Sequence, residues 1–361
     1  MRRLAWFLCG LAVLLALYPR SLDAVAVTGF PGRELESLLH EITDVRLKCL
    51  LSGDPGDLER VYDTSTTSGA YAFEHEVGRV RYFREWLSKR SIEILAADAS
   101  LRIVDSGIDG HRAWASICHN VILTYRRNGS QVFNQMGVRT IHWMEFSRRG
   151  ERWLISKDWF WDPLGSSPRP RVPAEIAPVP PTEEGRRTAG AESRSYNRGA
   201  AVLYADRYCG VKAGAGTGRY NPRYRDFTNL GGDCTNFASQ VLADPEAGGL
   251  PMDGGWFYEG GQGTNTWICA GEFVGHLLYG GLATLVKRGR YATVAPLVSR
   301  LEPGDIIAFE KAGEIKHVSV VTGKDSDGRV VVNSHSADRY RVPWDLGFEE
   351  GDVFWLIHIT G

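Results

Sequence analysis

Apolar residues first recur at helical spacing and then alternate with polar residues over four longer stretches. Between residues 35 and 50 they return every three or four positions, which predicts a helix. Asp54-Pro55 predicts the start of a second helix, and residues 77–87 predict a third. The alternating stretches predict strands at residues 92–105, 113–126, 131–146 and 153–161. Glycine-containing turns separate these stretches, so we expect an antiparallel meander.

Helices followed by a long sheet resemble, in element order, the cone-shaped NTF2-like α+β fold. That resemblance implies such a domain over residues 31–165. Some of these cones enclose a small-molecule pocket, which strand residues would line; the candidates are His111, Cys118, His119 and His142. No acid–base spacing singles them out, so we interpret them as ordinary strand residues.

The composition changes twice along the remainder of the chain. Residues 166–194 are rich in proline and polar residues, which predicts a semi-extended linker without a core. Residues 195–361 then predict helices at 200–208, from Cys234 onward and at 267–278. Short strands follow, predicted at 306–309, 315–322, 329–335 and 353–359. Tight turns join the first three strands as hairpins, so this part is predicted to be a second α+β domain.

The first 26 residues have the layout of a secretory signal peptide. Two arginines precede an apolar run over residues 4–17, and Ala24-Val25-Ala26 offers a small-residue cleavage site. The run is too short to span a bilayer as a helix. We therefore expect a protein secreted or held in the cell envelope. The alternative is an uncleaved membrane anchor, which would be the chain's contact with a membrane.

Charge and cysteine content narrow the function further. The 42 Lys and Arg residues balance 43 Asp and Glu residues, which argues against a nucleic-acid-binding protein. Removal of the signal segment takes Cys9 from the six cysteines and leaves an odd number. No CxxC pair or metal-type spacing occurs, so the pattern favours one functional thiol. The alternatives are five buried, inert cysteines, or the pairs Cys49–Cys118 and Cys209–Cys269.

The most informative segment is GGDCTNFASQVL at residues 231–242. Asp233 suits an N-cap, and the apolar spacing after it places Cys234 in the first turn of a helix, on the core-facing side. Backbone N–H groups and the helix dipole there favour a thiolate, which predicts a lowered thiol pKa. The same N–H groups can hold an oxyanion. The alternative is a small residue that packs the helix start.

A histidine on a later strand can complete such a site. His317 precedes an apolar strand and can pair with Cys234 as a thiolate and imidazolium. Alternation on the next strand brings Asn333 and His335 to one face, where either can accept the other ring N–H of His317.

These motifs resemble the putative amidase domain of bacterial exported proteins, a relative of the NlpC/P60 and CHAP cysteine peptidases and amidases. The resemblance covers GGDCTNFASQ, LEPGDII (301–307), HVSVVTG (317–323) and the tyrosine-containing segments at 196–201 and 221–224. It implies a papain-like core with Cys234 as nucleophile, His317 as general base and acid, and His335 as the third residue, with Asn333 as its competitor. It also implies an amide or peptide substrate, with cell-wall stem peptides as the analogous case, and no metal or organic cofactor.

Candidate substrate contacts surround the nucleophile. Asp233 and Tyr224 lie near it in sequence, and Trp256 and Trp267 occur among glycines, where they can wall a groove or simply pack. The expected reaction is amide hydrolysis through an acyl-enzyme. The alternatives are acyl transfer or transpeptidation through the same intermediate, and a binding module of the cell envelope without catalytic activity.

Overall fold

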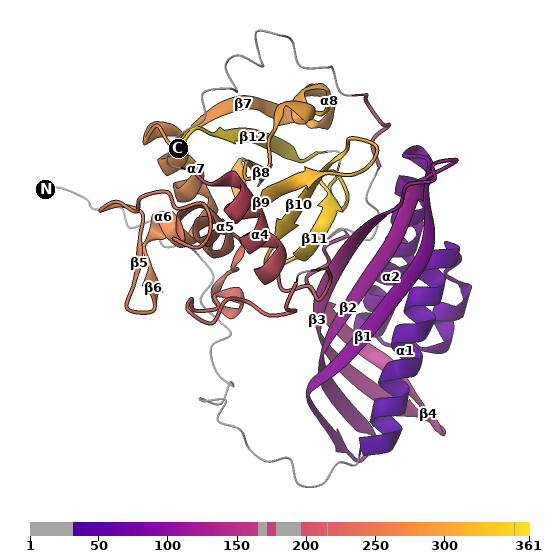
Figure 1. The fold of residues 1–361 in the computed structure, drawn as a ribbon. Coiled ribbons are helices and arrows are strands. Elements are labelled where there is room, and N and C mark those ends of the chain that lie inside the picture. The colour runs from indigo at the N-terminus through magenta and orange to yellow at the C-terminus, as the bar shows by residue number, and fades with distance from the viewer. Residues whose placement is uncertain (1–31, 165–171, 178–195, 215, 350) are drawn as a thin grey trace, which may run out of the picture.

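The computed structural model describes residues 32–164, 172–177, 196–214, 216–349 and 351–361 (Figure 1). The predicted signal peptide and most of the predicted linker lie outside the described residues.

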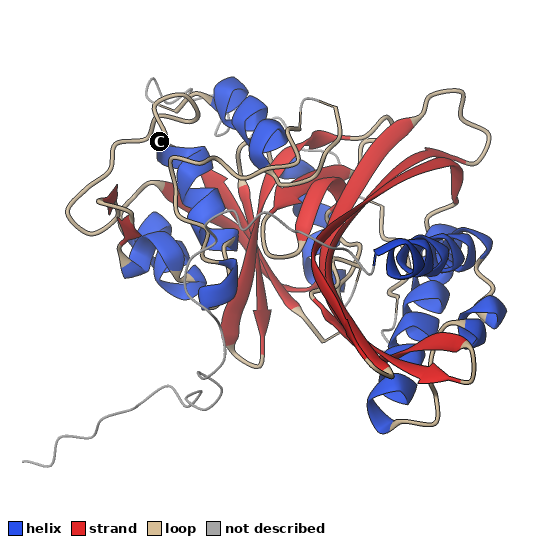
Figure 2. Ribbon diagram, turned by 90° about the horizontal axis from the view of Figure 1, so that it is seen from below, coloured by secondary structure: helices blue, strands red, loops and turns tan. Residues whose placement is uncertain are grey.

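The N-terminal half has helices followed by an antiparallel meander, as predicted. Its curved sheet wraps around the helices (Figure 2). The predicted second helix is a single 3₁₀ turn, because Val61 and Asp63 must form backbone hydrogen bonds with Ile155 directly after it. The elements are α1 (Gly32–Ser52), η1 (Gly56–Arg60), α2 (Thr67–Lys89), β1 (Ile92–Asp109), β2 (Arg112–Arg127), β3 (Asn134–Arg149) and β4 (Arg152–Phe160).

The C-terminal half places helices before a run of short strands, which confirms its predicted element order. The helices are α4 (Arg198–Tyr208), η2 (Thr228–Leu230), α5 (Cys234–Ala243), α6 (Asn265–Ile268), α7 (Ala270–Tyr279), α8 (Tyr291–Val294) and η3 (Ala295–Arg300). The strands are β5 (Tyr258–Glu259), β6 (Gln262–Gly263), β7 (Ala283–Arg290), β8 (Ile306–Lys311), β9 (Glu314–Lys324), β10 (Val330–Ser334), β11 (Asp338–Pro343) and β12 (Val353–Ile359). Four of these strands, β5, β6, β7 and β11, were not predicted from the sequence.

The two halves share one sheet. Its strand order is β1-β2-β3-β11-β10-β9-β8-β12-β7, with β4 also paired to β3. The junction is the antiparallel pairing of β11 with β3, in which Arg339 lies opposite Val138 and Tyr340 opposite Gly137. The second α+β unit is therefore joined to the first by backbone hydrogen bonds between strands.

Both faces of β9 are covered in the C-terminal half. Val318 and Val320 pack into the cluster that contains the residues of α5, whereas Val321 packs into a second cluster with Phe309. Because successive strand residues point to opposite faces, this division fixes which side chains of β9 look toward α5.

One described part of the predicted linker is packed rather than free. Val172 is buried, and its carbonyl accepts a hydrogen bond from Lys89 Nζ at 2.7 Å. Arg90 Nη1 donates to the carbonyl of Pro173 at 2.8 Å. These contacts hold residues 172–177 against the end of α2, which composition alone did not predict. Among the described helices, none is long and apolar enough to cross a membrane.

Candidate active site

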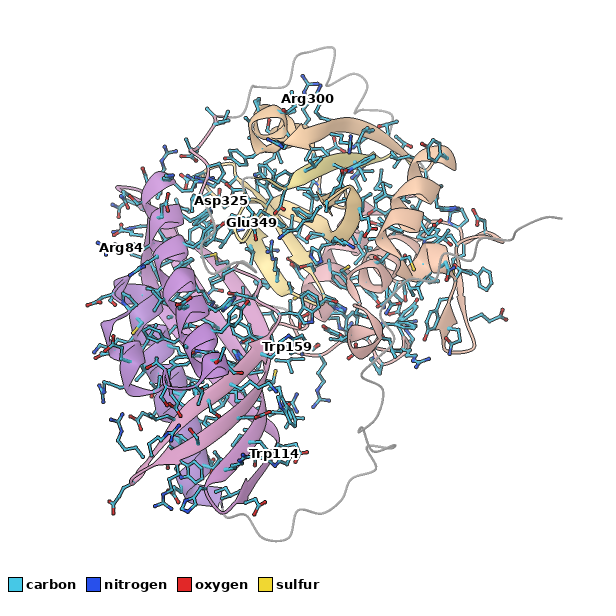
Figure 3. The ribbon with its side chains drawn as sticks, turned by 180° about the vertical axis from the view of Figure 1, so that it is seen from behind. Arg84, Trp114, Trp159, Arg300, Asp325 and Glu349 are labelled. Atoms are coloured by element: carbon cyan, nitrogen blue, oxygen red, sulfur yellow. The ribbon has the colours of Figure 1, made fainter. Side chains whose placement is uncertain are left out.

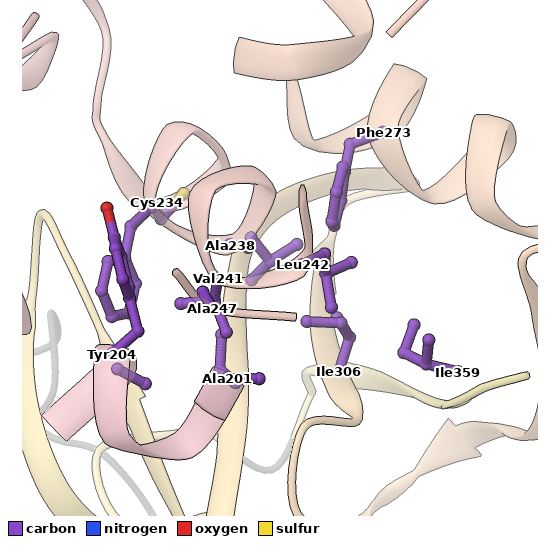
Figure 4. Packing of buried hydrophobic residues seen from close by; sticks show 14 of the residues in the cluster. Ala201, Tyr204, Cys234, Ala238, Val241, Leu242, Ala247, Phe273, Ile306 and Ile359 are labelled. Carbon is purple, nitrogen blue, oxygen red and sulfur yellow. The ribbon is translucent and has the colours of Figure 1, made fainter. Parts of the chain in front are cut away.

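Cys234 is the first residue of α5, as predicted. Its side chain is buried at one end of the cluster that α5 forms with β8 and β9, whereas Val241, Leu242 and Ile306 lie within it (Figure 4). The preceding turn needs backbone angles that only glycine adopts freely, because Gly231 and Gly232 have φ values of 117° and 124°. The two glycines thus let the chain turn directly into the helix that carries the sulfur.

Asp233 occupies the N-cap position but does not cap the helix through its side chain. Its Oδ1 accepts from the backbone N–H of Phe227 at 2.8 Å and from Asn236 Nδ2 at 2.9 Å. Its Oδ2 lies 2.6 Å from His335 Nδ1. The predicted cap is therefore wrong in its chemistry, and the first N–H groups of α5 are left without a side-chain acceptor from Asp233.

His335 is held on every side. Its ring stacks between Tyr220, at 3.5 Å between centroids, and Phe237, at 4.0 Å. Its Nε2 lies 2.6 Å from the carbonyl oxygen of Tyr208. Carboxylate and carbonyl oxygens only accept hydrogen bonds, so both contacts are hydrogen bonds at once only when both ring nitrogens carry a proton. The geometry makes His335 a support for Asp233 and hence for the turn before Cys234.

Asn333 is engaged away from the sulfur. Its Nδ2 donates to Asp206 Oδ1 at 3.0 Å, and its Oδ1 accepts from the backbone N–H of Arg341 at 2.6 Å. Asn333 therefore links β10 to α4 and β11. The sequence had suggested that Asn333 could accept a hydrogen bond from His317, and no such bond forms among the described residues.

The fold brings β9 to the sulfur but turns the His317 ring away from it. The backbone of Val318 contacts the Cys234 thiol. The His317 ring instead packs against Phe309, with centroids 5.7 Å apart, in the cluster on the opposite face of the sheet. Burial and the nearby Arg339 guanidinium lower the pKa of His317 to about 3, and its Nε2 has no hydrogen-bond partner among the residues that the structure describes. The predicted contact between His317 and Cys234 is therefore absent from this arrangement.

The electrostatics of the sulfur also differ from expectation. Burial raises the pKa of the Cys234 thiol, and this effect exceeds the opposing effects of the Val318 backbone and the Thr235 hydroxyl, which lies 3.7 Å from Sγ. The prediction of a lowered pKa was wrong for this state, because the desolvation of a fully enclosed sulfur outweighs the favourable helix start. The sulfur here is a neutral thiol.

The two candidate tryptophans are core residues. Trp256 and Trp267 are fully buried. Their indole N–H groups donate to Ser239 Oγ at 3.0 Å and to Asn236 Oδ1 at 2.8 Å. The packing interpretation holds for both, and neither lines a groove. Tyr224 is half-buried and donates to Asp244 Oδ2 at 2.8 Å.

The remaining described cysteines form no disulfides. Cys49, Cys118 and Cys209 are buried free thiols, and Cys269 is an exposed one. The pairs considered from the sequence are therefore absent. Cys49 packs under the N-terminal sheet and Cys209 in the C-terminal cluster, so burial accounts for these two thiols.

A chain of contacts without a signature in the sequence leads from the N-terminal half to the turn before Cys234. Arg139 of β3 donates to Asp338 Oδ2 at 2.5 Å, and Tyr220 donates to Asp338 Oδ1 at 2.6 Å. Tyr220 then stacks on His335, which holds the residue before Cys234. These residues come from distant segments without a shared motif, so only the β3–β11 pairing shows their connection.

The four strand residues considered as a possible pocket lining in the N-terminal half differ in burial and in their contacts. His111 is exposed, whereas Cys118 is buried in β2. His142 Nδ1 lies 3.0 Å from Asp158 Oδ1 within a buried ion-pair network. Burial lowers the pKa of His119 to about 3. No group of three or more metal-ligating side chains occurs in the described part of the chain.

Comparison with known families bears on the C-terminal half. Residues 195–357 match the family model of the putative amidase domain. This match confirms the resemblance seen in the motifs around Cys234 and His317, and the family description indicates amide hydrolysis. The match covers under half of the chain and does not extend to the N-terminal half.

Other comparisons add little. The intermembrane space region of the chloroplast protein ARC6 aligns with 37% of this chain and 98% of its own length, at 11% identity and a TM-score of 0.26. No match is found among the curated proteins. The fold observed here is a mixed α and β structure with a large antiparallel sheet.

Proposed function

We propose that residues 196–361 hydrolyse an amide bond with Cys234 as the nucleophile. The observation that carries this proposal is the position of the sulfur at the start of α5, where N–H groups of the first turn are not capped by Asp233. Such groups can hold the oxyanion of a tetrahedral intermediate and contribute about 3 kcal/mol to lowering the barrier. The amidase family match supports the same reaction.

The reaction needs a partner for the thiol proton, and we assign that role to His317. The sulfur passes its proton to the imidazole as the S–C bond forms, and the imidazolium protonates the leaving amine as the C–N bond breaks. Water then adds to the thioester and the S–C bond breaks, which releases a carboxylic acid and restores the thiol. His335 and Asp233 act as positioning residues that fix the nucleophile turn.

His317 can act only if its ring turns to the α5 side of the sheet. The β9 segment offers a place for this change, because the pairing of β8 with β9 skips Lys316 in a bulge directly before His317. Bulges redirect side chains, and the neighbouring Val318 backbone already meets the sulfur. Substrate binding at Cys234 is the proposed trigger.

We also propose that residues 1–26 direct export of the protein. The proposed substrates are peptides, including cell-wall stem peptides. Both proposals rest on the sequence pattern of residues 1–26 and on the family resemblance. The N-terminal half has no assigned role in this reaction.

The test combines product release with thiol labelling. The purified protein is incubated with synthetic stem-type peptide amides, and amine release is followed by mass spectrometry. We expect turnover that is abolished in Cys234→Ala and reduced 10²-fold or more in His317→Ala. Replacement of the exposed His111 by Ala is the matched control and should leave turnover unchanged. A trapped acyl adduct on Cys234 would support the thioester directly.

A second candidate function is a binding module without catalytic activity, favoured by the buried thiol and by the packing of the His317 ring against Phe309. Iodoacetamide near pH 6 separates the two. Selective labelling of Cys234 that is lost in His317→Ala supports the hydrolase. Slow, uniform labelling of all thiols, together with no turnover of any amide, supports the binding module.

A further inference from the structure

The turn between β10 and β11 makes two contacts with the residue before Cys234. The first is the contact described above, in which His335 Nδ1 lies 2.6 Å from Asp233 Oδ2. The second comes from the next residue, Ser336, because the backbone N–H of Asp233 donates to Ser336 Oγ at 2.5 Å. One turn therefore holds both the carboxylate and the backbone of Asp233.

This turn has a fixed base. The strands β10 and β11 pair with each other on either side of it, and β11 pairs in turn with β3. Figure 3 shows this junction from behind, with the yellow C-terminal strands beside the N-terminal sheet. Within the turn, Ser334 Oγ donates to the carbonyl of Ala337 at 2.8 Å. The side chains of the turn are thus presented to α5 from a backbone that is held in place.

Ser336 has a backbone conformation that serine seldom adopts. Its φ of 70° lies in the left-handed region, which glycine enters freely and residues with a Cβ enter at a cost. Such residues keep this conformation only where their surroundings impose it, and they are frequent at functional sites. A glycine would fit this backbone better but has no hydroxyl. The contact with the Asp233 N–H is what a serine supplies here and a glycine cannot.

The two contacts hold Asp233 in a conformation that does not cap α5. An N-cap residue usually has an extended backbone, which lets its side chain turn back to the first N–H groups of the helix. Thr66, which caps α2, has a φ of −100° and a ψ of 145°. Asp233 has a φ of −118° and a ψ of 1°. Its carboxylate accordingly points to His335 and not to the N–H groups of its own helix.

An aspartate released from this turn can cap its own helix. Aspartate is among the preferred N-cap residues, and the helix dipole favours a carboxylate at the helix start. Rotation of the Asp233 backbone toward the conformation of Thr66 would bring its carboxylate to the N–H groups beside Cys234. Those N–H groups are the ones that the proposed reaction uses for the oxyanion. A capped α5 would therefore make the carboxylate compete with the substrate for the same donors.

We propose that Ser336 is a positioning residue, whose hydroxyl holds the Asp233 backbone out of the capping conformation and so keeps the start of α5 open. Ser336 acts through Asp233 and takes no part in the making or breaking of bonds. The inference rests on the proposed function for the use of these N–H groups in catalysis. The hydrogen bond to Asp233 and its effect on the turn can be tested without it.

The first test compares Ser336→Gly with Ser336→Ala in the full-length protein. Both variants lack the hydroxyl, but only glycine relieves the left-handed backbone, so Ser336→Gly should unfold at a higher temperature than Ser336→Ala. In hydrolysis of a stem-type peptide amide, both should lower kcat about tenfold and change KM less than twofold, because the donors that are lost act on the transition state. If Ser336 only stabilised the fold, kcat would follow the stability of each variant.

The second test is hydrogen exchange, which needs no turnover. The Asp233 amide loses its acceptor in both variants, so its exchange with D₂O, followed by NMR, should be at least tenfold faster than in wild type. A wild-type protein that hydrolyses no amide overturns the proposed function. In that case the exchange rate of the Asp233 amide still decides the role of Ser336.

Ser91 provides the matched control, because it is a second serine in the left-handed region. It has a φ of 51° and is exposed between α2 and β1. Ser91→Gly and Ser91→Ala should leave both kcat and the exchange of the Asp233 amide at wild-type values. The proposal is overturned if the Asp233 amide exchanges at the wild-type rate in both Ser336 variants. It is also overturned if an active Ser336→Gly variant has the kcat of wild type.

Discussion

At the scale of single residues, burial decides how the ionisable groups behave. Glu76 is fully buried, which by itself would raise its pKa, yet Arg46 and Arg79 lower the pKa to about 2. Cys234 is enclosed without a positively charged partner among its interacting groups, and its thiol pKa rises. The same desolvation thus gives an ionised carboxylate in one half and a neutral thiol in the other, according to whether an opposite charge is present.

The Glu76 network predicts a pH-dependent stability. A folded-state pKa near 2, below the ordinary 4.5, means that ionised Glu76 stabilises the protein fully above about pH 4.5, and that this contribution is lost as the pH falls toward 2. Glu76→Gln should therefore lower the free energy of unfolding by roughly 3 kcal/mol at pH 7, and the difference from wild type should shrink between pH 5 and pH 2.

Urea unfolding at several pH values measures this difference. Glu36→Gln, on an exposed face of α1, is the control and should track wild type throughout. A Glu76→Gln deficit that stays constant from pH 7 to pH 3 would contradict the assignment of the low pKa.

At the scale of elements, the N-cap residues of α2 and α5 have different roles: one caps its helix and the other does not. Thr66 Oγ1 accepts from the backbone N–H of Gly69 at 3.0 Å and caps α2. Asp233 stands at the same position before α5, but its carboxylate turns to His335 and leaves the helix start open. The uncapped start is the one beside the proposed nucleophile.

Removal of the true cap should have a measurable cost. Thr66→Ala should lower the free energy of unfolding by about 1 kcal/mol, because one N–H of the first turn of α2 loses its acceptor. Thr66→Ser should recover most of that loss, and Thr67→Ala, one position along on an exposed site, should cost less than Thr66→Ala. Equal losses for Thr66→Ala and Thr67→Ala in thermal unfolding would argue against a capping role.

Local signals predicted most of the elements, and non-local contacts account for what they missed. Turn glycines and alternation locate β1 to β4 because these signals lie within each hairpin. The short β11 carries Arg339 and Arg341 in a brief segment after His335, and its pairing with β3 spans about two hundred residues of chain.

The candidate site was predicted in part for the same reason. The helical spacing after Gly232 placed Cys234 correctly. The face of His317 could not be read from alternation, because both faces of β9 are buried and a bulge precedes the residue. The contact of Asp233 with His335 joins residues 102 positions apart and leaves no local trace.

At the scale of the whole molecule, the N-terminal half contributes to the surroundings of Cys234. Arg139 projects from β3, holds Asp338 of β11 and lies over the ring of Tyr220, with 4.8 Å between its Cζ and the ring centroid. Tyr220 covers His335. A residue outside the amidase match therefore supports, through Tyr220 and His335, the turn before Cys234.

Arg139→Met should loosen this region. Asp338 would lose its buried partner, and Tyr220 and His335 would lose their support, so we expect Cys234 to react with iodoacetamide several-fold faster at pH 8.5 than in wild type. Mass spectrometry of the labelled peptide gives the rate. Arg102→Met, at an exposed position on β1, should show the wild-type rate. If a folded Arg139→Met variant is labelled at Cys234 at the wild-type rate, then Arg139 does not support the surroundings of Cys234 and this prediction is wrong.

The pairing of β3 with β11 also has a consequence for dissection of the protein. One side of β3 is shared, with β4 along residues 142–149 and β11 along residues 137–139. A fragment that ends after β4 would leave residues 137–139 of β3 unpaired, and one that begins at α4 would leave β11 as an edge strand. Unpaired backbone N–H and C=O groups at such edges can pair with strands of other copies. Fragments cut between the halves should therefore self-associate in size-exclusion chromatography, and a chain that keeps both halves is the form suited to expression and crystallisation.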